Sequence, residues 1–472
     1  MSPSIASMMR RPLTVALVVA LLDPGAAFAA TAKEKELEAR VAQLEAQVQA
    51  LLNAQKQQQV QIDDTRSRVA DTQTEVAATK TQVADTKAQI EKAPKSTFTT
   101  GPGLSVAFHG FINANAFGQS NTFSYGNGAN GQYPVAGSRG ELSGVDIRNT
   151  RFWLDIGGAK FGENWTGGGR IEMDFFGGFN GTGAYSLSQP TPRLRQAYFD
   201  VANAGSGTNV RVGQQWDLIM PVDMLPDSVT HVAFPLGYGT GLIGWRYPGA
   251  VLSQNLGASG DTKWGVDIGV FEGTWSNQGT AVNHLTDGNA DFRPQLEARL
   301  RAQGSNWSAF VAAHYASIDL KGVAGTDATP IKTGLDSTGF EVGATFRPGP
   351  WNFKALLYTG TAMGPLFGAM SQFGDIDETG GYFQAGYKLN KNWSVNAFYS
   401  ASLPDKQDII AWYGHGSTGI DRDQQVALNL IYAEGPYKLG IEALRATLHM
   451  NTGAAASTTT GNQVSLSGQY TF

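Results

Sequence analysis

The last twelve residues, GNQVSLSGQYTF (461–472), place apolar and polar side chains at alternating positions. One parity holds Val464, Leu466, Gly468, Tyr470 and Phe472, and the other holds Ser465, Ser467, Gln469 and Thr471. A period of two predicts a β-strand whose two faces meet different surroundings. Because the chain ends on an aromatic ring, the first face needs an apolar environment that a soluble terminus would not provide.

Similar alternating segments recur throughout 105–472, and GFEVGATFRPG (339–349) and GYFQAGYKLN (381–390) are clear examples. Sixteen of them are found, near 106–117, 148–157, 165–176, 193–202, 208–216, 240–248, 262–272, 292–303, 306–317, 338–347, 351–360, 380–390, 392–401, 423–433, 436–447 and 461–472. The connections between them alternate short and long, which is typical of outer-membrane barrels. We therefore expect an all-β transmembrane barrel of sixteen antiparallel strands, with both termini on the short-turn, periplasmic side. A soluble two-sheet sandwich is the alternative, but it would not explain apolar outward faces on all strands.

Aromatic residues open six of the seven strands that follow a short turn: Trp165, Trp264, Trp307, Trp351, Trp393 and Tyr437. Rings at one height of a barrel form the aromatic girdle that lies where the lipid headgroups begin. The sequence therefore predicts contact with outer-membrane lipid and lipopolysaccharide. In this setting Phe472 would face lipid.

The N-terminus predicts a secretory signal over residues 1–29. Arg10 and Arg11 precede an apolar run of about ten residues, and Ala27-Phe28-Ala29 resembles a cleavage site. The run is too short for a transmembrane helix; a buried helix is the alternative reading. The chain has no Cys, which excludes disulfides and thiolate chemistry.

Residues 33–92 carry an a/d heptad pattern. Positions from Val41 to Ile90 and from Leu37 to Thr86 each step by seven without a break. This pattern predicts a coiled coil, and the β-branched residues at many core positions favour a trimer. A solvated amphipathic helix is the alternative. The arm is electrically neutral, so it is not a nucleic-acid tail. Residues 93–104 are expected to link this arm to the barrel.

Enzyme motifs are weak, and we expect no enzyme, cofactor or metal site. The six His residues show no HExxH spacing. Gly239, Gly241 and Gly244 match GxGxxG, but the motif leads into Trp245-Arg246-Tyr247-Pro248 and not into a helix. We interpret these as barrel glycines.

Arginine is concentrated in one part of the barrel. Eight of the fourteen barrel arginines lie between positions 139 and 246. Strand parity directs four of them into the lumen: Arg151, Arg170, Arg211 and Arg246. Such a band would select anions and hold carboxylates in bidentate fashion. Alternatively, these arginines merely pair with Asp155, Glu172 and Asp174, and both interpretations can hold together.

Arg193 and Arg195 fall on the apolar parity of their strand. Either a bulge changes the phase of the strand, or both residues lie above the lipid. The connection DLIMPVDMLPDSVTHVAFPLGYG (217–239) is unusually apolar, so we expect it to fold into the lumen. Four of its residues would then face the arginines: Asp217, Asp223, Asp227 and His231. An ordinary surface loop is the alternative.

Five stretches, together with the signal peptide, the coiled coil and the strand count, resemble the DcaP-like outer-membrane porins. They are HGFINANAF (109–117), IRNTRFWLDIGG (147–158), EMDFFGG (172–178), PRLRQAYFDV (192–201) and VGQQWDLIMP (212–221). The resemblance implies a homotrimeric channel with a periplasmic coiled coil that takes up small organic anions, with dicarboxylates as the suspected class. The basic residues in the matching stretches are Arg148, Arg151, Arg193 and Arg195.

Three other functions remain open. Phosphate-selective porins rely on lysine clusters, whereas this barrel has nine scattered Lys residues. A barrel phospholipase would need an exposed Ser–His pair at the upper rim. A cell-envelope tether would use the barrel as an anchor and the arm to grip peptidoglycan.

Overall fold

The computed structural model describes residues 39–50, 52–53, 55–59, 97–101, 103–124, 128, 131–177, 190–273, 293–320 and 331–472. The chain divides into two units, Met1–Pro94 and Lys95–Phe472. The predicted signal peptide lies outside the described residues. No helix in the described part of the chain is long and apolar enough to cross a membrane.

In the first unit, the described residues within 39–59 are helical. The core heptad positions Val41, Leu44 and Val48 are exposed in the single chain. The remainder of the predicted coiled coil, up to residue 92, lies outside the described residues. The coiled coil therefore stays a prediction.

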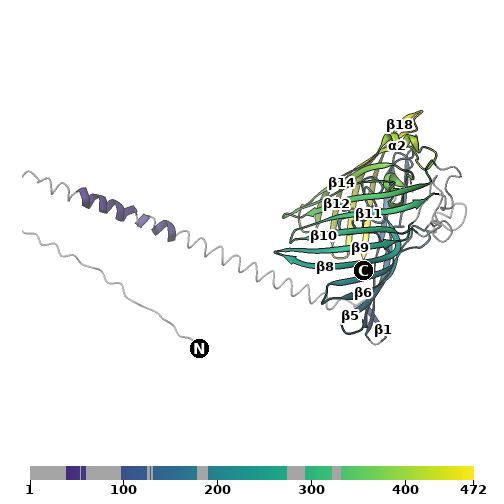
Figure 1. Ribbon diagram of the computed structural model, residues 1–472. Helices are drawn as coiled ribbons and strands as arrows, with labels where there is room; N and C mark the ends of the chain where they lie inside the picture. The colour runs from purple at the N-terminus through teal and green to yellow at the C-terminus, as the bar shows by residue number, and fades with distance from the viewer. Residues whose placement is uncertain are drawn as a thin grey trace, which may run out of the picture. The chain divides into compact units, whose positions relative to one another are not determined.

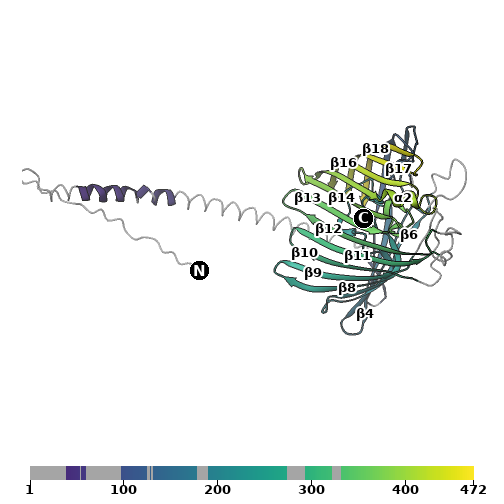
Figure 2. The same ribbon diagram turned by 45° about the horizontal axis from the view of Figure 1, so that its top comes forward.

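The second unit is one antiparallel sheet of eighteen strand segments (Figure 1). They are β1 (Thr97–Gly101), β2 (Leu104–Gln119), β3 (Leu142–Asp146), β4 (Arg151–Phe161), β5 (Trp165–Asp174), β6 (Arg193–Asn203), β7 (Thr208–Trp216), β8 (Arg246–Ser259), β9 (Thr262–Phe271), β10 (Gln295–Gln303), β11 (Trp307–Asp319), β12 (Gly334–Phe346), β13 (Trp351–Thr361), β14 (Asp377–Lys388), β15 (Trp393–Pro404), β16 (Ile420–Glu434), β17 (Tyr437–Asn451) and β18 (Ala456–Thr471). From β8 to β18 the strands form one continuous curved wall (Figure 2).

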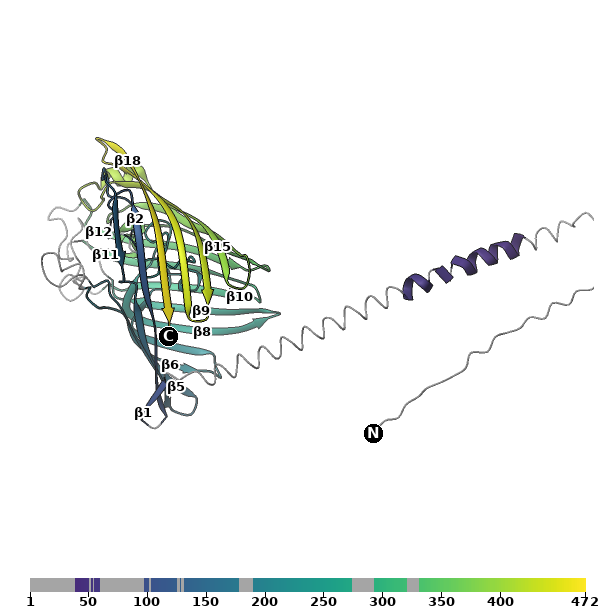
Figure 3. The ribbon, with the colours of Figure 1, turned by 180° about the vertical axis from the view of Figure 1, so that it is seen from behind.

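These segments make a closed barrel of sixteen strands, which confirms the predicted number. β3 and β4 pair with successive parts of β2 and together act as one interrupted strand. β18 pairs with β2 and closes the barrel (Figure 3). β1 pairs with the start of β2, beyond the point where β18 ends, so it occupies part of the predicted linker. Phe472 exchanges backbone hydrogen bonds with Gly110, and its ring packs against Phe108.

One predicted strand is misplaced. The segment expected at 240–248 begins only at Arg246 and runs to Ser259. Gly241 and Gly244 have φ angles of +98° and +105°, which an extended strand does not use. The alternation in this segment belongs to a folded loop, so these glycines are loop residues and not barrel-strand residues.

The girdle aromatics lie where their strands leave the short turns. Trp165, Trp307, Trp351, Trp393 and Tyr437 are the first residues of their strands, and Trp264 is the third residue of β9. Partner strands add further rings to the girdle, because Trp351 packs on Tyr387, Trp393 on Tyr432 and Tyr437 on Tyr470. A membrane boundary at this height stays a prediction.

Candidate functional site: an inserted loop and an arginine wall

The connection after β7 folds into the barrel interior and extends to residue 245. We call residues 217–245 the inserted loop; it contains the short 3-10 helix η3 (Val222–Met224). Ile219, Met220, Leu236 and Leu242 are at most 1% exposed and form the main buried cluster with inward side chains of the wall. Burial of this apolar surface holds the loop in the lumen.

Asp217 joins the two ends of the inserted loop. Its carboxylate accepts hydrogen bonds from the backbone N–H groups of Met220 and Trp245, each at 2.8 Å. Burial, reinforced by the neighbouring Glu297 carboxylate, raises the pKa of Asp217 well above its usual range. The residue therefore has a structural role at the base of the loop.

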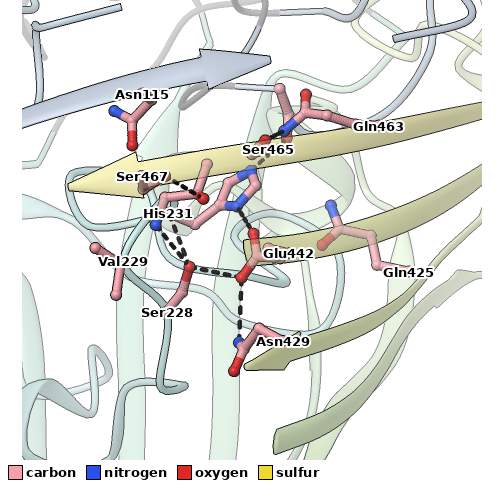
Figure 4. A network of polar contacts seen from close by, with 12 residues as sticks. Asn115, Ser228, Val229, His231, Gln425, Asn429, Glu442, Gln463, Ser465 and Ser467 are labelled. Atoms are coloured by element: carbon pink, nitrogen blue, oxygen red, sulfur yellow. Dashed lines mark hydrogen bonds and ion pairs between the residues drawn. The ribbon is translucent and has the colours of Figure 1, made fainter. Parts of the chain in front are cut away.

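The middle of the inserted loop is bound to the far wall (Figure 4). His231 Nδ1 lies 2.6 Å from a Glu442 oxygen, and the Ser228 hydroxyl donates to the other oxygen at 2.7 Å. Asp227 pairs with Lys354 at 2.9 Å. Asp227 and His231 therefore do not face the arginines, because the loop crosses the lumen and presents them to β13 and β17.

A second connection also enters the lumen, which the sequence analysis missed. It carries the 3-10 helices η4 (Gly364–Leu366) and η5 (Gly368–Met370), and the carbonyl of Leu366 accepts a hydrogen bond from Gly244 N–H. Its apolar sequence, AMGPLFGAM (362–370), was the available signal. The connection after β15 carries the short helix α2 (Lys406–Ala411). Its N-cap residue Asp405 accepts hydrogen bonds from two backbone N–H groups, and Ile409 is its one buried residue.

The seven predicted arginines lie together on and beside β4 to β8, and we call them the arginine wall: Arg148, Arg151, Arg170, Arg193, Arg195, Arg211 and Arg246. Four of them are paired with carboxylates. Arg170 binds Asp155 through two hydrogen bonds, at 2.7 and 2.9 Å. Arg148 binds Asp146 in the same manner, at 2.9 and 2.8 Å.

Arg193 and Arg195 face the lumen because of a bulge. The register between β5 and β6 shifts between Glu172 and Met173, so that Arg195 is the extra residue. Arg195 is 2% exposed and bonds Glu172 at 2.6 Å and Asp174 at 2.7 Å. Arg193 binds Asp174 at 2.7 and 3.0 Å. Of the two interpretations left open by the sequence, the bulge is the one the structure contains.

The other three arginines lack such partners. Arg211 and Arg246 form no ion pair with any described carboxylate. Arg151 lies 3.8 Å from Glu172, and its Nη2 donates a hydrogen bond to the Val232 carbonyl of the inserted loop at 3.3 Å. The buried Nε atoms of all three, and Nη1 of Arg246, have no hydrogen-bond partner within the described ranges. Arg246 stacks on Trp245 and Trp216, with its Cζ atom 4.2 and 4.8 Å from the ring centroids. These atoms are buried N–H donors without an acceptor among the described residues.

A cavity of about 470 Å³ separates part of the arginine wall from the inserted loop. Five arginines line it, against the two acids Glu172 and Asp217: Arg151, Arg170, Arg195, Arg211 and Arg299. Asp217 is thus the one predicted loop residue that reaches this cavity. Asp223 instead lines a separate cavity with Arg299 and Arg301, two arginines on β10 that the sequence analysis did not single out. Their inward parity was the available signal.

Ser228, His231 and Glu442 do not form a hydrolytic triad. The Ser228 hydroxyl donates to Glu442 and not to the imidazole, and His231 Nε2 lies 3.3 Å from the Gly131 carbonyl. The side chains of His231 and Glu442 are 1% and 3% exposed. A nucleophile needs its base within hydrogen-bond reach, and this imidazole is turned away from the serine.

The outer-membrane channel DcaP of Acinetobacter baumannii has a similar structure, with a TM-score of 0.61 and 18% sequence identity over 79% of this chain and 99% of that chain. This barrel has the fold of an outer-membrane channel. Similarity also extends, at TM-scores of 0.48 and 0.49 and 13% identity, to OmpT of Vibrio cholerae and an anion-selective porin from Comamonas acidovorans. These matches cover 80% and 78% of this chain and all of the other chains. No protein-family model matches the sequence, and no curated protein matches it.

Proposed function

We propose that this protein is an outer-membrane porin through which small organic anions diffuse, with dicarboxylates as the preferred class. The observation that supports this most directly is the cavity of about 470 Å³ that five arginines line against only two acids, Glu172 and Asp217. The formal net charge of the chain is −5, so anion preference would have to come from this local positive band.

Dicarboxylates suit the arginine wall because each carboxylate can take two parallel N–H donors from one guanidinium. Arg151 and Arg211 line the same cavity on different strands, so they offer two separate points of attachment. The paired arginines support this arrangement, since their carboxylates hold the wall in place. The two interpretations of the arginines are therefore compatible.

The proposal includes a homotrimer joined by the 33–92 coiled coil in the periplasm. The girdle aromatics would meet lipid, and lipopolysaccharide would cover the barrel on the long-loop side. The arm could also contact peptidoglycan, in which case the channel would serve as an anchor too.

Ion selectivity in planar bilayers tests the central proposal. We expect an anion-selective reversal potential and block of chloride current by butanedioate. The double variant Arg211→Ala/Arg246→Ala should lose much of the anion selectivity and much of the block by butanedioate. The variant Arg347→Ala/Arg422→Ala removes the same charge from exposed positions and should behave as wild type. If the first variant retains the wild-type reversal potential and block, the arginine wall is structural and not selective.

Lysine replacements separate charge from geometry. Lys keeps the positive charge but lacks the planar fork of Arg. Arg211→Lys/Arg246→Lys should therefore weaken butanedioate block more than it changes chloride conductance. Raising the salt concentration should reduce anion selectivity in part, as Arg211→Ala/Arg246→Ala does. Dissolved ions screen the arginine charges over about 8–10 Å at physiological ionic strength.

A further inference from the structure

A second cavity, of about 460 Å³, lies at the short-turn end of the barrel. It is bounded by the η3 end of the inserted loop and by the short-turn ends of β8 to β11. Arg299 lines both this cavity and the one at the arginine wall. A solute that leaves the arginine wall toward the short-turn end would therefore meet this second cavity.

One side of the cavity is cationic. Arg299 and Arg301 share a single carboxylate, that of Asp267, at 3.1 Å each. Lys263 also lines the cavity, as does the acidic Asp223. Three cations thus stand against two carboxylates, so one positive charge is in excess. The Arg301 side chain is 40% exposed, so its guanidinium is accessible to a ligand.

The other side is apolar. Pro221 and Met224 of the inserted loop and Phe310 of β11 line it. Phe310 and Met224 are only 7% and 5% exposed, so the surrounding structure holds both in place. A carboxylate bound to Arg301 would leave the remainder of its molecule against this apolar surface.

We propose that this cavity binds amphipathic monocarboxylates, with the carboxylate on Arg299 and Arg301 and the hydrocarbon tail on Met224 and Phe310. A dicarboxylate fits less well, because its second charged group would lose water without gaining a partner. The two cavities thus differ in the solutes they prefer. A role in permeation rests on the proposed porin function, whereas binding itself does not.

Isothermal titration calorimetry tests the site in the full-length Arg151→Ala/Arg211→Ala protein in detergent, with hexanoate and hexanedioate as a matched pair of ligands. This background removes the two attachment points proposed for dicarboxylates at the arginine wall. We expect hexanoate to bind more tightly than hexanedioate at this site. The affinity should rise from butanoate to hexanoate by about fourfold for each methylene that becomes fully buried.

Two substitutions remove or displace the cation. Arg301→Gln should weaken hexanoate binding by about tenfold or more, since hydrogen bonds to charged groups are lost. A Cβ atom at Gly265 would lie 2.6 Å from Arg301 Cζ, so Gly265→Ala should displace the guanidinium and weaken binding without removing its charge. Asp223→Asn should strengthen binding. Arg347→Gln, at an exposed position beside a short turn, is the control and should have no effect.

Equal affinities for hexanoate and hexanedioate, or unchanged hexanoate binding by Arg301→Gln, would overturn the proposal. An equal loss in Arg347→Gln would also overturn it, because the effect would then be general electrostatics. The porin proposal is tested separately by reversal potential. An anion-selective channel that does not bind hexanoate defeats the second site alone, whereas hexanoate binding by a cation-selective barrel defeats the porin proposal alone.

Discussion

Arg195 shows how the position of a single residue decides what a charged side chain does. Strand parity alone would direct it toward lipid, but the bulge opposite Glu172 turns it into the lumen. There it donates hydrogen bonds to Asp174, which also accepts from Arg193, and to Glu172, which also accepts from Gln196. A buried network of this kind is sensitive to the removal of one member, since the remaining charges are left without compensation.

We therefore expect Arg195→Met to lower the free energy of unfolding of the barrel by about 3–5 kcal/mol. Arg246→Met should lower the free energy of unfolding much less, because Arg246 forms no ion pair with a carboxylate in the described ranges and carries buried donors without partners there. Urea titration in detergent, followed by the mobility shift of the folded barrel on gels, measures both variants. Equal losses of stability would show that the bulge network is not the dominant contribution.

At the scale of elements, the inserted loop depends on close approach between backbones. A Cβ at Gly241 would lie 2.2 Å from the Gly381 carbonyl oxygen, and Gly241 has a φ of +98°. Gly257 has a similar φ of +93° on β8, but a Cβ there would meet no atom within 4 Å. The two glycines therefore share the backbone requirement and differ in packing.

Gly241→Ala should displace the inserted loop, because a backbone carbonyl cannot yield as a flexible side chain can. We expect larger and noisier single-channel conductance, together with a loss of stability that exceeds that of Gly257→Ala. Gly257→Ala, the control, should lower the free energy of unfolding only by the backbone strain of a left-handed alanine, about 1–3 kcal/mol. Wild-type conductance in Gly241→Ala would mean that the loop does not limit the pore.

At the scale of the whole molecule, the arm and the barrel differ in whether a single chain can satisfy their stabilising contacts. The barrel completes its own hydrogen bonding by closing β18 on β2. The described part of the arm, in contrast, exposes Val41, Leu44 and Val48 along one stripe. An apolar stripe of this spacing is stabilised when identical helices cover it.

A peptide spanning 33–92 should therefore be helical and sediment as a trimer. β-Branched residues at many a and d positions favour three strands over two. Sedimentation equilibrium combined with circular dichroism measures both properties. Replacing Val41 and Val48 with Asn should lower the thermal midpoint, whereas the same change at Gln43 and Gln49, which occupy outer c and b heptad positions, should have little effect. A clean dimer, or an unfolded monomer, would contradict this prediction.

The sequence alone determined the barrel and the number of its strands. These features follow from period-two alternation and turn spacing, which are local and survive without knowledge of any partner. The apolar composition of 217–239 likewise predicted a loop inside the lumen, because exposing so much apolar surface to water would be unfavourable.

Tertiary structure decided which groups meet. His231 and Glu442 are 211 residues apart in the chain, and Asp227 and Lys354 are separated by more than a hundred. No local pattern records such distances, so Asp227 and His231 were assigned to the wrong wall. The bulge at Arg195 and the start of β8 at Arg246 were also beyond the sequence, because one extra residue or a few left-handed glycines change the phase of a strand without changing its composition.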